Sequence, residues 1–504
     1  MNLLLLFRTL CNLKLIQILY QIKYRLIKPL NNEQKAPVSR MRKCYYGVTP
    51  IPKTISLFSG SHITFLNIGG SFRDWGYTDN GMLWAYNLNY MDWLNQVGGT
   101  FEEGAEWIDK FISEFESNIV GLDPYPIALR GINWIKFITK YYNQIDLSKL
   151  RRWNDSLYSQ YKLLEKKLEW HLMGNHLLED AYSLFIASIY FNDRRMYRRY
   201  SRLLKQELSE QILADGAHYE QSPMYHCILL DRLLDCYNIS KSNMYFDGQD
   251  SVNMFLESKA SLMLGYLESI VYDNGDIPLL NDSAFGVAPS PKDLFDYAER
   301  LGIKWEKKTP NESGYRIRKN VKFEAILDVG NITVSYQPGH SHADTLNYEL
   351  RIEGMPFVVD TGISTYEKNA RRQFERSTVA HNCVSPDGKD SSEVWGGFRV
   401  GRRCHCEILE ETSDSITAFH DGFDKQCKRR FKIIDSDFIV EDWYEGDAVS
   451  YIHLAEGADY SRILVEGAND IVVKDYEYST EYNKFHKGKV IEIKFNGYLK
   501  YTIR

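Results

Sequence analysis

The chain has 504 residues, of which 44% are hydrophobic and 25% charged, and its formal net charge is -6. This composition is ordinary for a folded globular protein, and the length predicts two or three domains. Basic and acidic residues are interspersed, so the composition argues against a nucleic-acid-binding protein with a strongly basic face. Aromatic residues are numerous, with 35 Tyr, 24 Phe and 10 Trp. Such rings suit stacking on sugars, although most of them must belong to the core.

The first segment, residues 1–82, is predicted to hold an amphipathic helix and an irregular lead-in. Leu3, Phe7 and Leu10 recur at helical spacing, with Arg8 and Lys14 between apolar residues. We expect this helix either to pack on the protein or to lie against a membrane surface, as a peripheral contact. It is too short and too charged for a convincing membrane-spanning helix.

Localisation is predicted from the same segment and from the cysteines. No clean signal peptide is visible, which favours a cytoplasmic or membrane-peripheral protein, with a periplasmic one as the alternative. The eight cysteines include no Cys-x-x-Cys pair. We therefore expect buried or free thiols, which favour a reducing compartment.

Residues 83–312 carry a helical pattern. Apolar residues recur every three or four positions, as in Trp107, Ile108 and Phe111, and breakers fall at 123–126 and 174–175. Serial helices with short turns over this length predict an (α/α) toroid or solenoid.

Residues 313–504 change to short strand-like runs. Examples are 322–329, 331–336 and 490–495, with turn residues between such runs. This pattern predicts an antiparallel β-sandwich. The predicted fold class is therefore α+β multidomain, with an N-terminal (α/α) toroid followed by a C-terminal antiparallel β-sandwich.

Two polar clusters lie at predicted helix starts. In the first, Asn175 is expected to cap a helix, with His176 in its first turn and Glu179 one turn later. An ordinary N-cap with an acidic residue near the positive helix end explains this cluster equally well. In the second, Ser222-Pro223 predicts a capped helix start from which Tyr225 projects into a cleft. Its alternative is a half-buried tyrosine.

The segment Gly339-His340-Ser341-His342 is the most informative part of the sequence. A His-x-His pair on an extended segment points both imidazoles to one side. Asp360 ends the next apolar run and His381 follows. Two imidazoles and one carboxylate from adjacent strands predict a zinc-type site, which leaves the other histidine of the pair for chemistry. Polar residues at strand ends are the alternative.

A series of motifs in chain order resembles the heparinase II/III-like polysaccharide lyases. The motifs are LWAYNLNYMDWL (83–94), RGINW (130–134), GNHLLED (174–180), DGAHYEQSPMYH (215–226), GHSHADTLNYEL (339–350), PFVVDTG (356–362) and RSTVAHN (376–382). The resemblance implies an (α/α) toroid and a β-sandwich. It also implies cleavage of heparin-like chains or alginate, while some related domains epimerise uronic acids.

The resemblance also implies roles for individual residues. Asn175 and His176 match the pair that meets the uronate carboxylate. Tyr225 matches the tyrosine of proton transfer, with Tyr219 as a lower-ranked rival, and His340 matches the histidine opposite it. In β-elimination, the pair neutralises the carboxylate while a base and an acid move the protons.

The resemblance implies a structural metal, usually zinc, and further contacts with substrate. The metal ligands would be His342, Asp360 and His381, and the metal would brace the loop that carries His340. Glu179 matches an acidic residue near the substrate in some members. Candidate contacts from residue type alone are a basic cluster for carboxylate or sulfate groups and a tryptophan for stacking: Arg371, Arg372, Arg376 and Trp134. A solvated loop and a core tryptophan are their alternatives.

Three functions follow. The favoured one is a lyase acting on an acidic, uronate-containing polysaccharide. The second is a uronyl C5-epimerase, and the third is a non-catalytic glycan-binding factor. The Leu-rich opening, residues 8–26, resembles members found among functions of polysaccharide assembly, so the expected substrate is a bacterial surface polysaccharide. The sequence predicts no oligomeric state.

Overall fold

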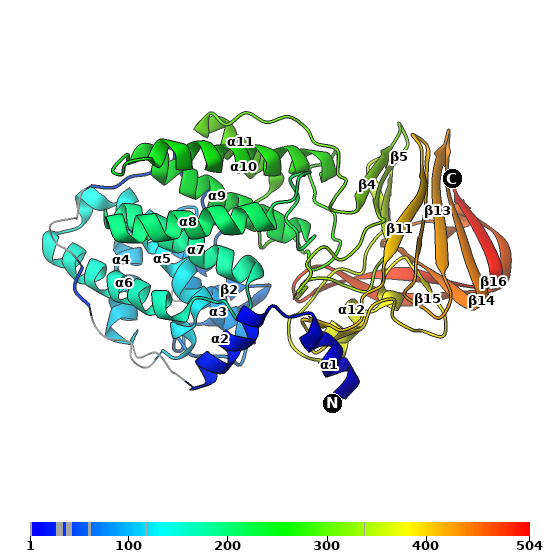
Figure 1. Cartoon of the computed structure of the whole chain (residues 1–504), viewed down its shortest axis with the longest axis horizontal. Coiled ribbons are helices and arrows are strands. Elements are labelled where there is room, and N and C mark those ends of the chain that lie inside the picture. Colours follow the sequence, from blue (N-terminus) through cyan, green and yellow to red (C-terminus); the bar gives the residue numbers. More distant parts are fainter. Residues whose placement is uncertain (1–2, 27–33, 37–42, 59–61, 116–117, 337) are drawn as a thin grey trace.

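The computed structural model describes residues 3–26, 34–36, 43–58, 62–115, 118–336 and 338–504. A helical part and a β part lie side by side, with the helices first in the chain (Figure 1). Each part encloses its own hydrophobic core. The predicted fold class, an α-toroid followed by an antiparallel β-sandwich, is confirmed.

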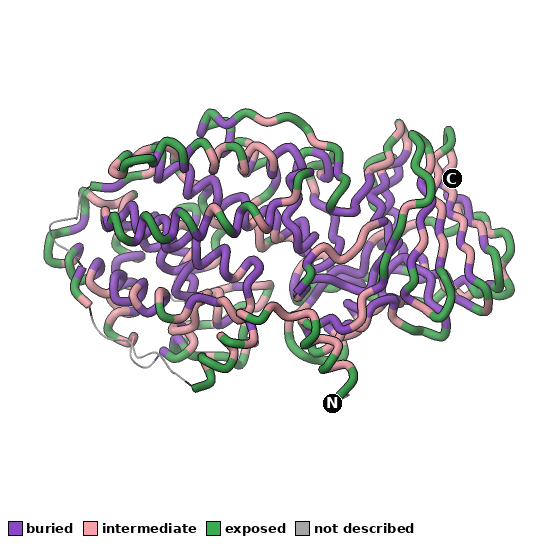
Figure 2. Tube along the Cα trace, viewed as in Figure 1, coloured by how far each residue is buried: buried purple, intermediate pink, exposed green. Residues whose placement is uncertain are grey.

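The helical part consists of helices that follow one another along the chain. Its helices are α3 (Met82–Tyr90), α4 (Phe101–Ser113), α5 (Pro124–Lys140), α6 (Leu147–Lys167), α7 (Gly174–Tyr190), α8 (Arg194–Gln211), α9 (Pro223–Ser242), α10 (Gln249–Ile270) and α11 (Pro291–Leu301). Helices α5, α7 and α9 are buried almost all round, and their buried residues include polar and charged side chains as well as apolar ones. Helix α8 instead buries one stripe and exposes its arginines, as expected for an outer helix of a toroid (Figure 2).

The β part is a large curled antiparallel sheet. Its strands are β4 (Tyr315–Lys319), β5 (Phe323–Asp328), β6 (Tyr348–Ile352), β7 (Met355–Val358), β8 (Val384–Ser385), β11 (Cys406–Glu411), β12 (Ser415–His420), β13 (Cys427–Ile434), β14 (Asp437–Leu454), β15 (Ile463–Glu481) and β16 (Lys484–Ile503). The strand order is β11-β12-β13-β14-β7-β6-β5-β4, and the long strand β14 also pairs with β8 and β16. In the chain, helix α12 (Ala370–Glu375) lies between β7 and β8. A short two-stranded pair, β9 (Val394–Trp395) and β10 (Arg399–Val400), lies between β8 and β11.

The prediction of a strand over residues 331–336 is wrong. This segment has no strand because its backbone binds a toroid side chain instead of a neighbouring strand. The amide of Gln221 donates to the Asn331 carbonyl at 2.9 Å and accepts from the Thr333 N–H at 3.1 Å. The segment therefore joins the β part to the toroid.

The described residues of the lead-in form two helices where the sequence predicts one. They are α1 (Leu3–Cys11) and α2 (Leu15–Leu26), and the break falls where the Asn12 side chain bonds the Arg8 carbonyl. A small sheet follows, of β1 (Leu57–Phe58), β2 (His62–Phe65) and β3 (Ile68–Ser71). In the described part of the chain, no single helix is long and apolar enough to cross a membrane. The pair α1–α2, bent by 115°, meets the criteria of length and composition together.

Candidate active site

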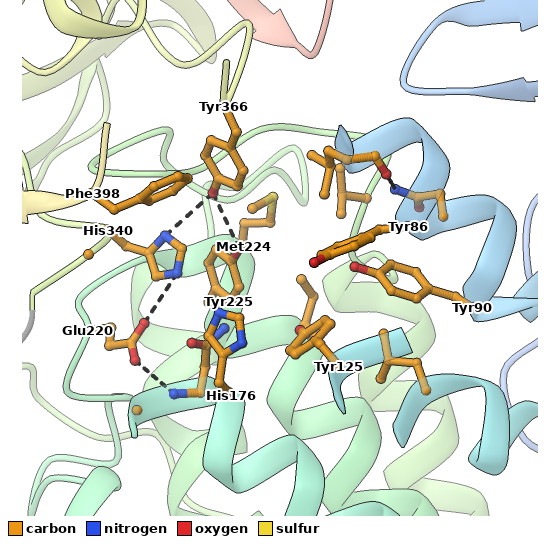
Figure 3. Close-up of a pocket in the computed structure, with 18 of the residues that line it drawn as sticks. Tyr86, Tyr90, Tyr125, His176, Glu220, Met224, Tyr225, His340, Tyr366 and Phe398 are labelled. Carbon is orange, nitrogen blue, oxygen red and sulfur yellow. Dashed lines mark hydrogen bonds and ion pairs between the residues drawn. The ribbon is translucent and has the colours of Figure 1, made fainter. Parts of the chain in front are cut away.

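A cavity of about 790 Å³ lies between the toroid and the β part. The first turns of α5, α7 and α9 line one side, and loops of the β part line the other (Figure 3). Asn175, His176, Tyr225 and His340 all line this cavity. Because helix N-termini carry partial positive charge, three of them at one cavity favour an anionic ligand.

The start of α7 is shaped by backbone conformation. Met173 has φ 59° and Gly174 has φ +60°. A Cβ at residue 174 would lie 2.4 Å from Oε1 of Glu220, so any other residue would have to displace that carboxylate as well as adopt the positive φ. The predicted capping role of Asn175 is wrong, since the N-cap is Met173 and makes no side-chain capping bond. Instead, the Asn175 N–H donates to Oε1 of Glu220 at 2.9 Å.

The start of α9 agrees with the prediction. Ser222 is the N-cap, its hydroxyl accepts from the Tyr225 N–H at 3.2 Å, and Pro223 opens the helix. The Tyr366 hydroxyl donates to the Tyr225 hydroxyl at 3.3 Å. Burial raises the pKa of Tyr225, which keeps the phenol neutral in the free cavity.

His340 lies against Tyr225 although the two come from different parts of the chain. Their ring centroids are 4.0 Å apart. Nδ1 of His340 lies 2.8 Å from Oδ2 of Asp282, and its Nε2 lies 3.5 Å from Oε2 of Glu220. The bond to a carboxylate favours the tautomer with the proton on Nδ1, which leaves Nε2 as the basic nitrogen.

Asp282 is the centre of a buried charged cluster. Its Oδ1 lies 2.8 Å from Nε2 of His342, and Nη2 of Arg372 donates to its Oδ2 at 2.7 Å. Burial alone raises the pKa of Asp282, but Arg372 and the two imidazoles outweigh burial and hold it well below its usual value. Asp282 therefore orients both histidines of the His-x-His segment as a carboxylate.

His176 is placed to meet an anion. Its Nδ1 lies 3.1 Å from Oε2 of Glu169. Burial opposes protonation of the ring, yet the Glu169 carboxylate raises the pKa of His176 above its usual value. A ring that protonates more readily is better suited to a carboxylate ligand.

Across the cavity stands a wall of tyrosines, Tyr86, Tyr90 and Tyr125 (Figure 3). The Tyr125 ring lies 4.8 Å from that of His176. Lys53 and Arg232 line the same cavity, each beside an acidic lining residue: Lys53 lies 3.9 Å from Asp92, and Arg232 lies 2.7 Å from Asp231. Aromatic faces beside cations suit an acidic sugar chain.

The predicted substrate contacts of the basic cluster need correction. Arg372 is 1% exposed and binds Asp282, and Arg376 is 0% exposed and donates to the Ser341 carbonyl at 2.8 Å. Arg371 pairs with Glu375 at 2.7 Å. None of these three arginines lines the cavity. Arg371 and Arg376 make these contacts within the β part, whereas Arg372 ties the β part to Asp282, which lies between α10 and α11 in the helical part. Buried guanidinium groups need such acceptors.

Trp134 and Glu179 also lie outside the cavity lining. Trp134 is 0% exposed in the toroid core, with its Nε1 directed to Sδ of Met91 at 3.2 Å. Glu179 is fully buried, with Oε2 at 3.6 Å from Nε of Arg232. Burial raises the pKa of Glu179 to about 7. Both predictions of a substrate contact are therefore corrected to positions behind the cavity wall.

Sequence reasoning missed Glu220, Asp282 and Tyr366. Glu220 stands inside the motif 215–226, so its proximity to Tyr225 was a usable signal. Asp282 follows Asn281, which has φ 56°, and lies far in sequence from the histidines it binds. Nothing local in the sequence indicates that contact.

The three predicted metal ligands lie near one another in the interior. Nδ1 of His381 lies 2.8 Å from Oδ2 of Asp360, and the rings of His342 and His381 are 5.2 Å apart. Nδ1 of His342 and Nε2 of His381 are buried without a hydrogen-bond partner among the described residues. The donor types suit zinc. Within the described ranges, however, no three or more His, Cys, Asp or Glu side chains form a group that would hold a metal ion as they stand. The zinc site stays a prediction.

Comparison with known proteins gives two family matches. Residues 132–295 match "Heparinase II/III N-terminus" and residues 304–496 match "Heparinase II/III-like, C-terminal". Among solved structures, one titled "Crystal Structure of Heparinase III" has a TM-score of 0.63 at 15% identity, covering 97% of this chain and 91% of that one. A heparan sulfate lyase of Pedobacter heparinus has a TM-score of 0.53 at 15% identity, covering 97% and 87%. At this identity the likeness shows the fold.

Curated relatives include two heparin-sulfate lyases. The one from Pedobacter heparinus is 25% identical over 247 residues, covering 43% of this chain and 36% of the relative. The one from Bacteroides thetaiotaomicron is 23% identical over 369 residues, covering 64% and 50%. The matches thus span half or less of the length of these two relatives.

Proposed function

The chain belongs to the heparinase II/III-like family, and we propose that it is a polysaccharide lyase that cleaves a uronate-containing glycan by β-elimination. One observation carries the proposal: the Tyr225 phenol and the His340 imidazole meet in the same cavity that Asn175 and His176 line. Proton-transfer groups and a carboxylate-binding pair are what this reaction needs.

The carboxylate of the uronate binds first in this mechanism. The proton on the neighbouring carbon, C5, is weakly acidic while the carboxylate is fully charged. Asn175 and the readily protonated His176 lie at the N-terminus of α7, where the helix dipole adds to their effect. Together they stabilise the enolate that forms when the proton leaves.

Proton transfer then divides between His340 and Tyr225. His340, held by Asp282 through Nδ1, takes the C5 proton on Nε2. The C4–O bond breaks as the C4–C5 double bond forms, and the neutral Tyr225 phenol protonates the leaving oxygen. The phenol thus donates a proton and the imidazole accepts one.

The contact between Tyr225 and His340 favours cleavage over epimerisation. An epimerase must return a proton to the opposite face of C5 from the one that lost it. Rings 4.0 Å apart reach the same face of a bound sugar. Adjacent base and acid groups therefore suit elimination, with both protons moving on one side.

The proposed function is tested by incubation with a panel of uronate polysaccharides in heavy water. Ultraviolet absorbance follows the unsaturated product, and mass spectrometry follows deuterium at C5. We expect new absorbance on at least one polymer. Deuterium uptake without absorbance would replace the lyase by the epimerase, and direct binding of a glycan with neither signal would leave a binding factor.

Zinc held by His342, Asp360 and His381 is a further part of the proposal. When bound, the ion would brace the loop that carries His340. Nδ1 of His342 has no hydrogen-bond partner among the residues that the structure describes, and this supports the assignment.

His342→Ala is expected to lower both metal content and thermal stability. The metal is measured by inductively coupled plasma mass spectrometry and stability by calorimetry. The matched control is His420→Ala, another buried histidine of the β part that is not a proposed ligand. Full zinc content in His342→Ala would remove this residue from the site.

A further inference from the structure

The helices α1 and α2 each direct a row of apolar residues outward. In α2 the exposed large apolar residues recur at i, i+4, i+7 and i+11: Leu15 (70% exposed), Leu19 (55%), Ile22 (52%) and Leu26 (78%). In α1 the exposed large apolar residues are Leu3, Leu4, Phe7 and Leu10. This spacing places each set on one face of its helix. We call these eight residues the apolar face of α1–α2.

Polar contacts hold the opposite sides of the two helices on the protein. Gln17, the buried residue of α2, donates through Nε2 to the Leu172 carbonyl at 3.0 Å, and Lys14 pairs with Glu210. In α1, Arg8 pairs with Glu393, and Thr9 accepts from Nε1 of Trp395 at 3.1 Å. The docked sides combine these polar bonds with the packing of Ile16, while eight apolar residues stay exposed, unlike in an ordinary surface helix. The exposed face therefore needs a separate explanation.

Charge indicates what covers the apolar face. Every charged residue in positions 1–32 is basic: Arg8, Lys14, Lys23, Arg25 and Lys28. Lys23 and Arg25 are exposed on α2, among the apolar residues. Two copies of such a segment would repel each other, whereas an anionic lipid surface attracts both its charges and its leucines. We propose that α1–α2 docks the protein on an anionic bilayer surface through this apolar face.

The docked helices touch both walls of the cavity. Tyr24 and Gln17 bind the carbonyls of Leu168 and Leu172, and the next residue, Met173, lines the cavity. On the other wall, Thr9 binds Trp395, next to the lining residue Gly396. Both helices lie along one edge of the molecule, below the junction of the two parts (Figure 1). Docking would hold the cavity rim beside the lipid surface, without a change in the catalytic groups.

The test uses the full chain and sedimentation with vesicles of phosphatidylcholine, with or without phosphatidylglycerol. We expect binding to the anionic vesicles that is at least about tenfold tighter than to the neutral ones and that weakens as salt is raised. The variant Leu15→Gln/Leu19→Gln/Ile22→Gln/Leu26→Gln should lose this binding by at least about tenfold. The matched control carries glutamine at four exposed apolar residues elsewhere: Ile119, Leu147, Met254 and Val321.

Other outcomes separate the alternatives. Circular dichroism and thermal unfolding of the variant check that the fold is kept. Equal vesicle binding by variant and wild type would overturn the proposal, as would absence of wild-type binding to anionic vesicles. A wild-type dimer that the variant converts to a monomer, without vesicle binding, would assign the face to a second copy. Lyase activity plays no part in these readouts, so the proposed function can fail independently.

Discussion

Tyr225→Phe is expected to lower kcat by roughly 10²–10⁴-fold, the range ascribed to one positioned acid or base. The substitution removes one oxygen and leaves the ring that packs 4.0 Å from His340. Folding should therefore be kept. If His340 is the base, as proposed, the variant should still exchange deuterium into C5 on the uncleaved polymer. Absorbance and mass spectrometry on one sample measure the two steps separately.

Tyr219→Phe is the matched control for Tyr225→Phe. The Tyr219 hydroxyl bonds that of Tyr336, and Tyr219 is not among the residues that line the cavity. We expect activity within a few-fold of wild type. Loss of exchange together with cleavage in Tyr225→Phe would make Tyr225 the base, and full activity there would remove it from the mechanism.

Local patterns in the sequence predicted much of the fold and the start of α9. The change from helical to strand periodicity lies between α11 and β4, where Leu301 ends α11 and Tyr315 begins the first sandwich strand. Ser222 and Pro223 specify the helix start through groups within a few residues of one another. Such signals survive in a single sequence because their partners are close along the chain.

The contacts that the sequence did not predict are those between distant residues. The sequence suggested Arg372 as a ligand for sulfate because nothing near it in the chain indicates its true partner. That partner, Asp282, lies 90 positions earlier. Lys53 comes from the lead-in, far from the motifs, yet it lines the cavity. The sequence around a charged loop residue does not indicate whether its side chain contacts water, substrate or a buried carboxylate. The packing of the toroid against the β part determines which of these it contacts.

Glu220 shows the same limit at shorter range. Its motif was recognised, but the tight approach of Gly174 to Oε1 of Glu220 depends on the positive φ of Met173 and Gly174. Left-handed backbone at a methionine is rare, and it occurs here beside proposed catalytic residues. Periodicity does not report such conformations, so the bond from the Asn175 N–H to Glu220 could not be predicted.

Asp282→Asn is expected to cost about 3–5 kcal/mol of unfolding free energy, as found when one partner of a buried ion pair is removed. The change keeps the shape of the side chain but leaves the Arg372 charge buried beside a neutral amide. His340 also loses the carboxylate that sets its tautomer, so activity should fall with stability. Urea unfolding and kinetics on the same preparation measure both effects.

Lowering the pH should reduce the difference in unfolding free energy between wild type and Asp282→Asn. The folded pKa of Asp282 lies below the model-compound value of 3.8, so its contribution is present above that pH and is lost as pH falls through the folded pKa.

Glu441→Gln, at the more exposed pair with Arg430, serves as the control and should cost at most about 1 kcal/mol. The double variant Asp282→Asn/Arg372→Met should regain part of the stability, because no buried charge is then left unpaired. Equal costs for Asp282→Asn and Glu441→Gln would contradict the central role of Asp282, because a carboxylate that orients both His340 and His342 must matter more than a surface pair.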